Sequence, residues 1–161
     1  MAGNENSEKM MKARQVYATM IKALNKAEWH FEEHEEDLTI VSGYTGDDFP
    51  IKYIMRVDPK RDCVSFRSAP FVTFPEDKRI DGAVATCVAN CGMVFGHFDY
   101  DINDGEICYV MSDSYLDCEV GVEFFMDMMA TAVTTSDRYN DRFMMLAKGL
   151  IDIQKFIELE G

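Results

Sequence analysis

The sequence has no apolar run long enough to span a membrane, and residues 1–12 lack the apolar core of a secretory signal. These two absences predict a cytoplasmic protein. Positive charge is also scarce, because 16 Lys and Arg residues stand against 29 Asp and Glu residues and leave a net charge of −13. Such a chain repels phosphate backbones and anionic lipid, so we expect neither nucleic acid nor a membrane as its partner.

The cysteine spacing of a disulfide framework is also missing. The five cysteines are irregularly spaced and odd in number: Cys63, Cys87, Cys91, Cys108 and Cys118. A chain of 161 residues buries about two-thirds of the surface that its unfolded form exposes, so one hydrophobic core can stabilise it without cross-links. We therefore predict reduced thiols and a single domain over residues 1–161, with residues 1–6 disordered.

Hydrophobic periodicity predicts an α+β fold, an antiparallel sheet of about five strands covered by helices in the order α-β-β-β-α-β-β-α. The predicted elements are a helix over 7–27, three or four strands within 29–66, a helix over 75–91, a hairpin over 93–113, and helices over 120–134 and 137–159. The second helix is expected to face the core with an apolar stripe of Ile80, Ala83, Val84, Cys87, Val88 and Cys91. Its two cysteines are therefore interpreted as small core residues.

The hairpin offers a register that can be worked out from its turn. Asp104-Gly105 suits a two-residue type I′ turn, in which both central residues have positive φ. Closing the strands there pairs Ile102 with Ile107, Tyr100 with Tyr109 and Phe98 with Met111. These six residues form one apolar ladder that helices should cover, while Asp99 and Asp101 lie on the opposite face.

Two short motifs match metal sites, and we interpret both as chance matches. The string from His30 to His34 fits a zinc-protease motif, but its flanks alternate like a strand, which would hold the two histidines about 13 Å apart. The spacing of Asp99, Asp101 and Asn103 fits a calcium loop, but the hairpin already accounts for these residues. We expect no metal and no cofactor, and we find no pattern that predicts catalytic residues.

The C-terminal helices carry more apolar surface than one contact face requires. The surplus side chains are Phe124, Met128, Met144, Met145, Ile151 and Phe156. We predict that these six residues bind a partner protein, because methionine adapts to varied surfaces and a large apolar patch needs a cover. The alternative is that the two helical segments bury each other within one chain.

The order of elements carries a family resemblance, strongest where Gly96-His97-Phe98-Asp99-Tyr100-Asp101 is followed by Asp104-Gly105-Glu106-Ile107-Cys108-Tyr109. Over roughly residues 9–157 the chain resembles the YbjN family, whose members are similar in fold to type III secretion chaperones. The resemblance implies a small cytoplasmic bacterial protein, described as a sensory-transduction regulator, without established catalytic residues. The chaperone-like fold implies protein partners and commonly homodimers.

Two hypotheses about function remain open at this point. The first is a non-enzymatic protein-binding or regulatory module, homodimeric, that holds a partner segment on apolar helix faces or on the sheet; an effector chaperone is one form of it. The second is a small-ligand sensor or enzyme with a pocket between the sheet and the C-terminal helices. His97, Cys108 and Tyr109 would lie near such a pocket.

Overall fold

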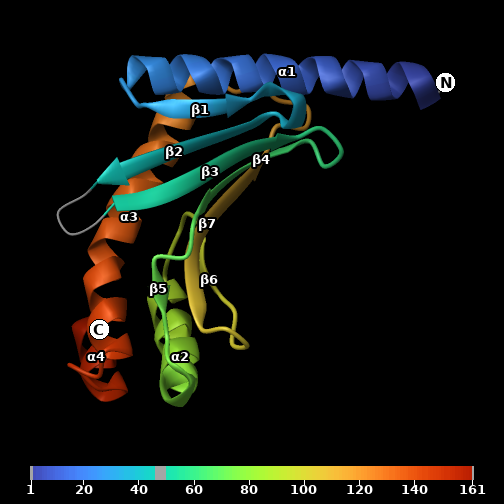
Figure 1. Ribbon diagram of the computed structural model, residues 1–161. Coiled ribbons are helices and arrows are strands. Elements are labelled where there is room, and N and C mark those ends of the chain that lie inside the picture. The colour runs from blue at the N-terminus through green and yellow to red at the C-terminus, as the bar shows by residue number, and fades with distance from the viewer. Residues whose placement is uncertain (1, 46–49, 161) are drawn as a thin grey trace.

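The computed structural model describes residues 2–45 and 50–160 (Figure 1). The helices are α1 (Ala2–Lys26), α2 (Arg79–Asn90), α3 (Val122–Ala147) and α4 (Ile153–Glu160), with short 3-10 helices at Glu35–Asp37 and Glu76–Lys78. The strands are β1 (Phe31–His34), β2 (Thr39–Thr45), β3 (Pro50–Asp58), β4 (Cys63–Ser68), β5 (Val72–Thr73), β6 (His97–Tyr100) and β7 (Glu106–Ser114). The predicted α+β class is confirmed, and α1 includes residues that we expected to be disordered.

All pairings within the described residues are antiparallel, and they join seven strands into one sheet. The order is β1-β2-β3-β4-β7-β5, and β6 pairs with β7 as well. β7 is therefore the central strand, because it contacts β4, β5 and β6. The short strand β5 is not predicted by the sequence, since two residues are too few to show alternation.

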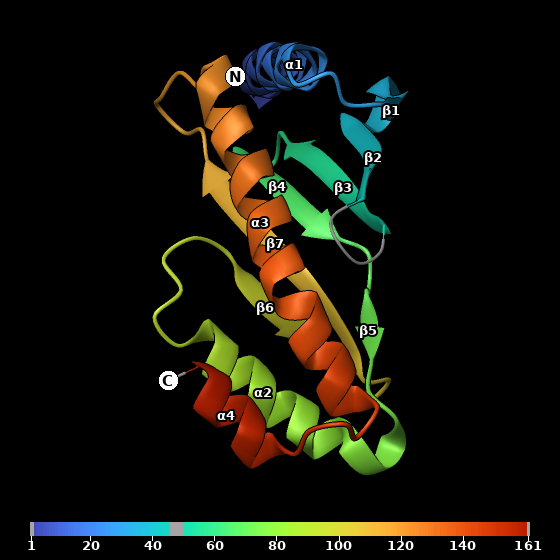
Figure 2. The same cartoon turned by 90° about the vertical axis from the view of Figure 1, so that its left-hand side faces the viewer.

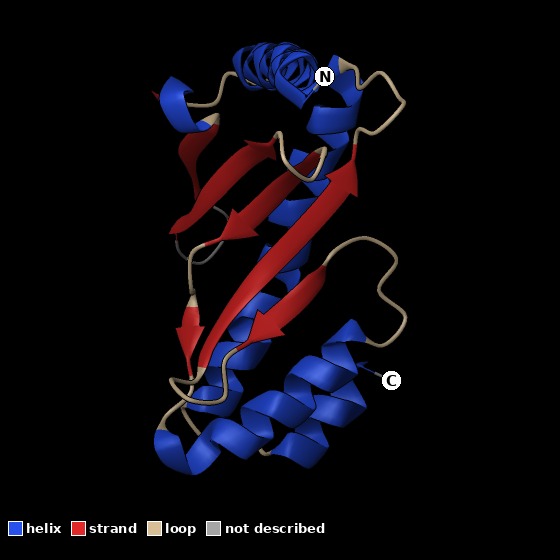
Figure 3. Cartoon of the chain, turned by 90° about the vertical axis from the view of Figure 1, so that its right-hand side faces the viewer, coloured by secondary structure: helices blue, strands red, loops and turns tan. Residues whose placement is uncertain are grey.

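Helices cover one face of the sheet. α1 lies across the β1–β4 end, and α3 runs along the length of the sheet to α2 and α4 at the β6 end (Figure 2). In the opposite view the strands lie in front of α3, and no described helix covers this face of β2, β3, β4 and β7 (Figure 3). The core therefore lies between the sheet and the helices. Over the described residues, no helix is both long and apolar enough to cross a membrane.

The β6–β7 hairpin has the predicted faces, but its register differs from the predicted one by two residues. Phe98 pairs with Tyr109, and Tyr100 pairs with Ile107. A shift of two residues keeps each paired side chain on its predicted face, because side chains alternate with a period of two. Phe98 is accordingly 2% exposed, whereas Ile102, which we predicted to be in the ladder, is 48% exposed. The predicted register is therefore wrong and the predicted faces are right.

The register shifts because a four-residue loop between Asp101 and Glu106 replaces the predicted type I′ turn. Asp101 Oδ1 accepts hydrogen bonds from the backbone N–H (2.8 Å) and side-chain amide (2.9 Å) of Asn103. Asp104 Oδ1 accepts the N–H of Glu106 at 2.9 Å. These local hydrogen bonds stabilise the longer loop, in which Gly105 supplies a positive φ of +82°.

The break in the C-terminal helical region also lies elsewhere than predicted. α3 runs unbroken through residues 134–137, where we expected a break. The Thr134 hydroxyl is accommodated within the helix, because its Oγ1 donates a hydrogen bond to the carbonyl of Ala130 at 2.8 Å. The break comes instead at Gly149, whose φ is +68°. Asp152 Oδ1 then accepts a backbone N–H in the first turn of α4 and caps that helix.

α2 faces the core with small residues instead of its larger apolar ones. The buried positions are Gly82, Ala85, Thr86 and Ala89. A Cβ added at Gly82 would lie 2.7 Å from the hydroxyl oxygen of Tyr100 and 2.8 Å from the ring of Phe74. The helix can approach these two rings closely only because the facing side chains are small. The predicted core stripe of α2 is therefore wrong for Ile80, Val84, Cys87 and Cys91, which are exposed because the helix is rotated to bury a different face, whereas Val88 does pack against the core.

Two tyrosines in the core predict how stability depends on pH. Burial raises the pKa of Tyr53 and of Tyr115 from 10.0 to about 12. The folded chain therefore keeps these protons up to about pH 12, whereas the unfolded chain releases them near pH 10. Stability should be fully present below pH 10 and fall between about pH 10 and 12, by about 1–3 kcal/mol for each tyrosine.

Urea unfolding at a series of pH values, with tyrosinate absorbance followed in parallel, tests this prediction. A Tyr53→Phe, Tyr115→Phe variant serves as the control, because it should lose stability less steeply over the same interval. A urea midpoint that stays constant through that interval in the parent chain would contradict the burial of both phenols.

Candidate protein-binding surfaces

The rotation of α2 places apolar side chains in solvent. Ile80, Val84, Cys87 and Cys91 recur at helical spacing on the exposed side of α2, and Val94 and Phe95 extend this side into the loop before β6. We call these six residues the α2 band. Ile80 is 68% exposed, Val94 82% and Phe95 59%. Single exposed apolar residues are ordinary, but a continuous group of them is typical of an interaction surface.

The α2 band is held on a well-anchored support. Asn90, the last residue of α2, donates its amide to the carbonyl of Phe98 (3.0 Å) and accepts the N–H of Phe98 (2.7 Å). The hydroxyl of Tyr109 donates to the carbonyl of Phe95 at 2.8 Å. The helix end and the loop are therefore fastened to β6 and β7, so the exposed apolar groups do not result from a loose segment.

The six residues predicted to bind a partner lie mostly inside the chain. Met128 and Phe156 are buried, and Phe124, Met144, Met145 and Ile151 are half-buried. α4 packs on α2 and α3, and the ring centroid of Phe156 lies 5.4 Å from that of Phe143 in α3. Much of the surplus apolar surface is thus covered within one chain. A partner-binding role for the four half-buried side chains stays a prediction, and the two buried ones would require the helices to open.

The pocket residues of the second hypothesis do not converge. Tyr109 is fully buried on the helix-covered face of the sheet, whereas Cys108 and His97 point to the uncovered face. Burial raises the pKa of the Cys108 thiol, although the guanidinium of Arg67, 3.4 Å from its sulfur, acts in the opposite direction. Cys108 is therefore held as a thiol, which is a poor nucleophile. This arrangement offers no nucleophile and base in contact.

The segment that follows His30 forms a strand, β1, as its alternating pattern predicted. His34 Nε2 lies 3.5 Å from a carboxylate oxygen of Glu32 on the exposed edge strand β1. Over residues 2–45 and 50–160, no group of three His, Cys, Asp or Glu side chains is arranged to hold a metal ion.

Comparison with known proteins places the chain by its fold alone. No family model and no curated protein matches the sequence. A chain of the solved ExsC-ExsE complex superposes with a TM-score of 0.58 at 10% identity, over 81% of this chain and 95% of that chain. A chain of the HopA1-SchA chaperone-effector complex gives a TM-score of 0.49 at 14% identity, over 83% and 96%. The likeness to the chain of the ExsC-ExsE complex shows that the two chains share one α+β fold.

Proposed function

We propose that this protein is a non-enzymatic protein-binding module, of the regulatory or chaperone-like kind that its YbjN resemblance implies, and that it works as a homodimer. The α2 band carries the proposal, because a stable monomer gains nothing by exposing six apolar side chains on a firmly anchored helix and loop. The fold supports it, since the similar chain with a TM-score of 0.58 comes from the structure of a protein complex.

Charge favours a second copy as the occupant of the α2 band. Two chains of net charge −13 repel each other, so a contact between them should use surface without charge. Residues 82–96 contain no Asp, Glu, Lys or Arg, in a chain of which 28% is charged. Five of the six α2 band residues lie in this stretch. The chain therefore presents its least repulsive surface where its exposed apolar groups gather.

Size-exclusion chromatography with light scattering tests the proposal. At micromolar concentration the chain should elute with twice its mass of 18.4 kDa. A Val84→Asp, Val94→Asp variant should be monomeric, because buried unpaired carboxylates should weaken the dimer about 100-fold or more, equivalent to about 2.7 kcal/mol.

The matched control places the same two charges on exposed leucines outside the α2 band, at Leu116 and Leu150. Leu116→Asp, Leu150→Asp should remain a dimer. A parent chain that is monomeric at every micromolar concentration would refute the homodimer.

A further inference from the structure

The uncovered face of the sheet carries a continuous row of side chains. Strand register places Val41, Ile54, Arg67, Val110 and His97 side by side across β2, β3, β4, β7 and β6. Their sequence neighbours Tyr53, Phe66 and Tyr109 are buried under the helices, so by strand alternation the row points to the uncovered face. Val41 and Val110 are half-buried, and Ile54 is 38% exposed. The row therefore leaves three apolar side chains partly open to solvent, next to the polar side chains of Arg67 and His97.

The β3–β4 hairpin, which contributes the middle of this face, is basic in an otherwise acidic protein. The β3–β4 hairpin, residues 50–68, contains five Lys and Arg residues and two Asp residues, which gives a net charge of +3. The remainder of the chain therefore has a net charge of −16. The five cations are Lys52, Arg56, Lys60, Arg61 and Arg67. Nearly a third of all Lys and Arg residues thus lie in this one hairpin.

The acids of the hairpin are engaged within the fold. Asp62 is buried and accepts a hydrogen bond from Lys9 of α1 at 2.7 Å. Asp58 accepts the backbone N–H of Lys60 (2.8 Å) and the guanidinium of Arg61 (3.0 Å). Asp58 lies on the same face of β3 as Lys52 and Arg56, but its side chain is only 16% exposed and its carboxylate pairs with Arg61 of the turn.

Lys52 and Arg56 are exposed on the same face of β3, on either side of Ile54. Among the residues that the structure describes, neither forms an ion pair, whereas Arg67 pairs with Asp99 at 2.9 Å. Two residues four apart on a strand are separated by about 13 Å. The uncovered face therefore offers two positive groups with an apolar side chain midway between them.

We propose that this face binds an acidic segment of a partner protein. Carboxylates of the segment would pair with Lys52 and Arg56, and an apolar side chain between them would cover Ile54. Such a pattern fits an extended segment in which acidic and apolar residues alternate. The inference rests on the proposed protein-binding role, but not on the homodimer, whose contact uses α2.

Charge also favours a short acidic protein segment over other anionic partners. A long polyanion or a membrane surface would extend beyond the basic hairpin. It would then be repelled by the remainder of the chain, whose net charge is −16, at distances comparable with the Debye length of about 8 Å. A short acidic segment contacts the hairpin alone. Two copies of this chain that face each other with their basic hairpins would repel.

Fluorescence anisotropy with a labelled peptide of alternating glutamate and leucine tests the inference on the full chain. Lys52→Glu, Arg56→Glu should weaken binding about tenfold or more, because attraction becomes repulsion on both sides of Ile54. The neutral variant Lys52→Gln, Arg56→Gln should weaken it about threefold. Raising the salt concentration should weaken binding by the parent chain but not by the charge-reversed variant, in which salt screens a repulsion.

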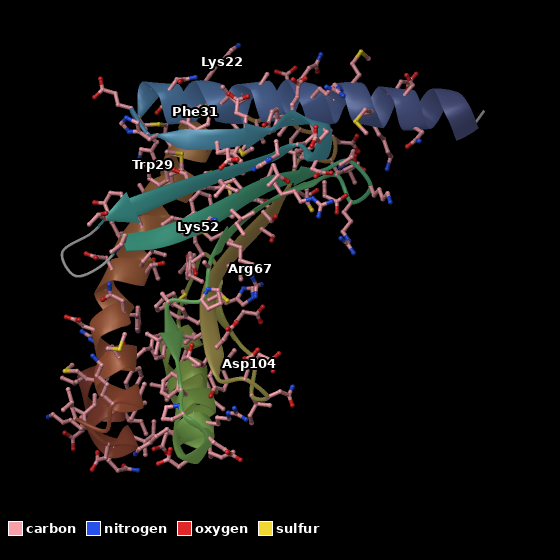
Figure 4. The ribbon with its side chains drawn as sticks, in the orientation of Figure 1. Lys22, Trp29, Phe31, Lys52, Arg67 and Asp104 are labelled. Carbon is pink, nitrogen blue, oxygen red and sulfur yellow. The ribbon has the colours of Figure 1, made fainter. Side chains whose placement is uncertain are left out.

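The matched control, Lys22→Glu, Lys148→Glu, makes the same change in net charge on exposed helix positions and should bind within about twofold of the parent. Figure 4 shows Lys22 on the side of α1 that points away from Lys52. The inference would be overturned if the Lys52→Glu, Arg56→Glu variant and the control lost the same affinity for the peptide. It would also be overturned if a peptide with lysine in place of glutamate bound equally well. Tighter binding of duplex DNA than of the acidic peptide would also overturn it. The dimer is measured separately by light scattering, so the failure of either idea is distinguishable from that of the other.

Discussion

Phe143→Ala is expected to lower the free energy of unfolding by about 3–5 kcal/mol, the range for removing a large aromatic side chain from a core. Phe143 is fully buried in α3. Its ring centroid lies 5.0 Å from that of Phe98 in β6, 5.4 Å from that of Phe156 in α4 and 6.4 Å from that of Phe74 after β5. One side chain thus joins the sheet to two helices. The expected loss is large, because the total free energy of unfolding of a domain is only about 5–15 kcal/mol.

Urea unfolding measures this loss, and limited proteolysis shows where it acts. Removing the Phe143 ring takes away the surface on which Phe156 packs, so α4 should detach and the link at residues 148–152 should be cleaved first. Leu150→Ala is the control, because Leu150 is exposed and its truncation should cost less than about 0.5 kcal/mol. A loss below about 1 kcal/mol for Phe143→Ala would mean that the aromatic cluster does not hold α4 in place.

Properties that depend on one strand could be predicted from the sequence. The alternation of Ile51, Tyr53, Met55 and Val57 predicts a half-buried strand, and all four residues are buried in β3. The faces of β6 and β7 follow from the same rule. Their register does not, because it depends on the hydrogen bonds of Asp101 and Asp104 in the loop, which compete with the type I′ turn that Asp104-Gly105 otherwise favours.

The orientation of α2 shows why the candidate surface was harder to predict. Apolar size favours Ile80 and Val84 as core residues, but the sheet presents large rings to this helix, and only the side with Gly82 and Ala85 fits against them. Which side is buried therefore depends on the partner layer and not on the helix alone. The uncharged stretch 82–96 is a signal in the sequence that could have indicated the surface. In the C-terminal region, Gly149 followed by Asp152 likewise indicates the true helix break.

Gly105→Ala is expected to destabilise the fold by about 3 kcal/mol or more, through two separate costs. Gly105 has a φ of +82°, which costs a residue with a Cβ about 1–2 kcal/mol. In addition, the new Cβ would lie 2.2 Å from the carbonyl oxygen of Phe74, and this neighbour is backbone that cannot rotate away. The N–H of Phe74 donates to the carbonyl of Gly105 at 2.8 Å, so the clash would also break this hydrogen bond.

Gly92→Ala separates the two costs. Gly92 has nearly the same φ, +80°, but a Cβ there would meet no atom within 4 Å, so only the backbone strain of about 1–2 kcal/mol should remain. The difference between the two variants in urea unfolding isolates the close approach of the hairpin loop to Phe74. Because Phe74 also packs on Phe143, displacing its backbone would disturb the aromatic cluster that joins the sheet to α3 and α4. If the two variants lost the same free energy of unfolding, the hairpin loop would not approach Phe74 closely and would be independent of the core.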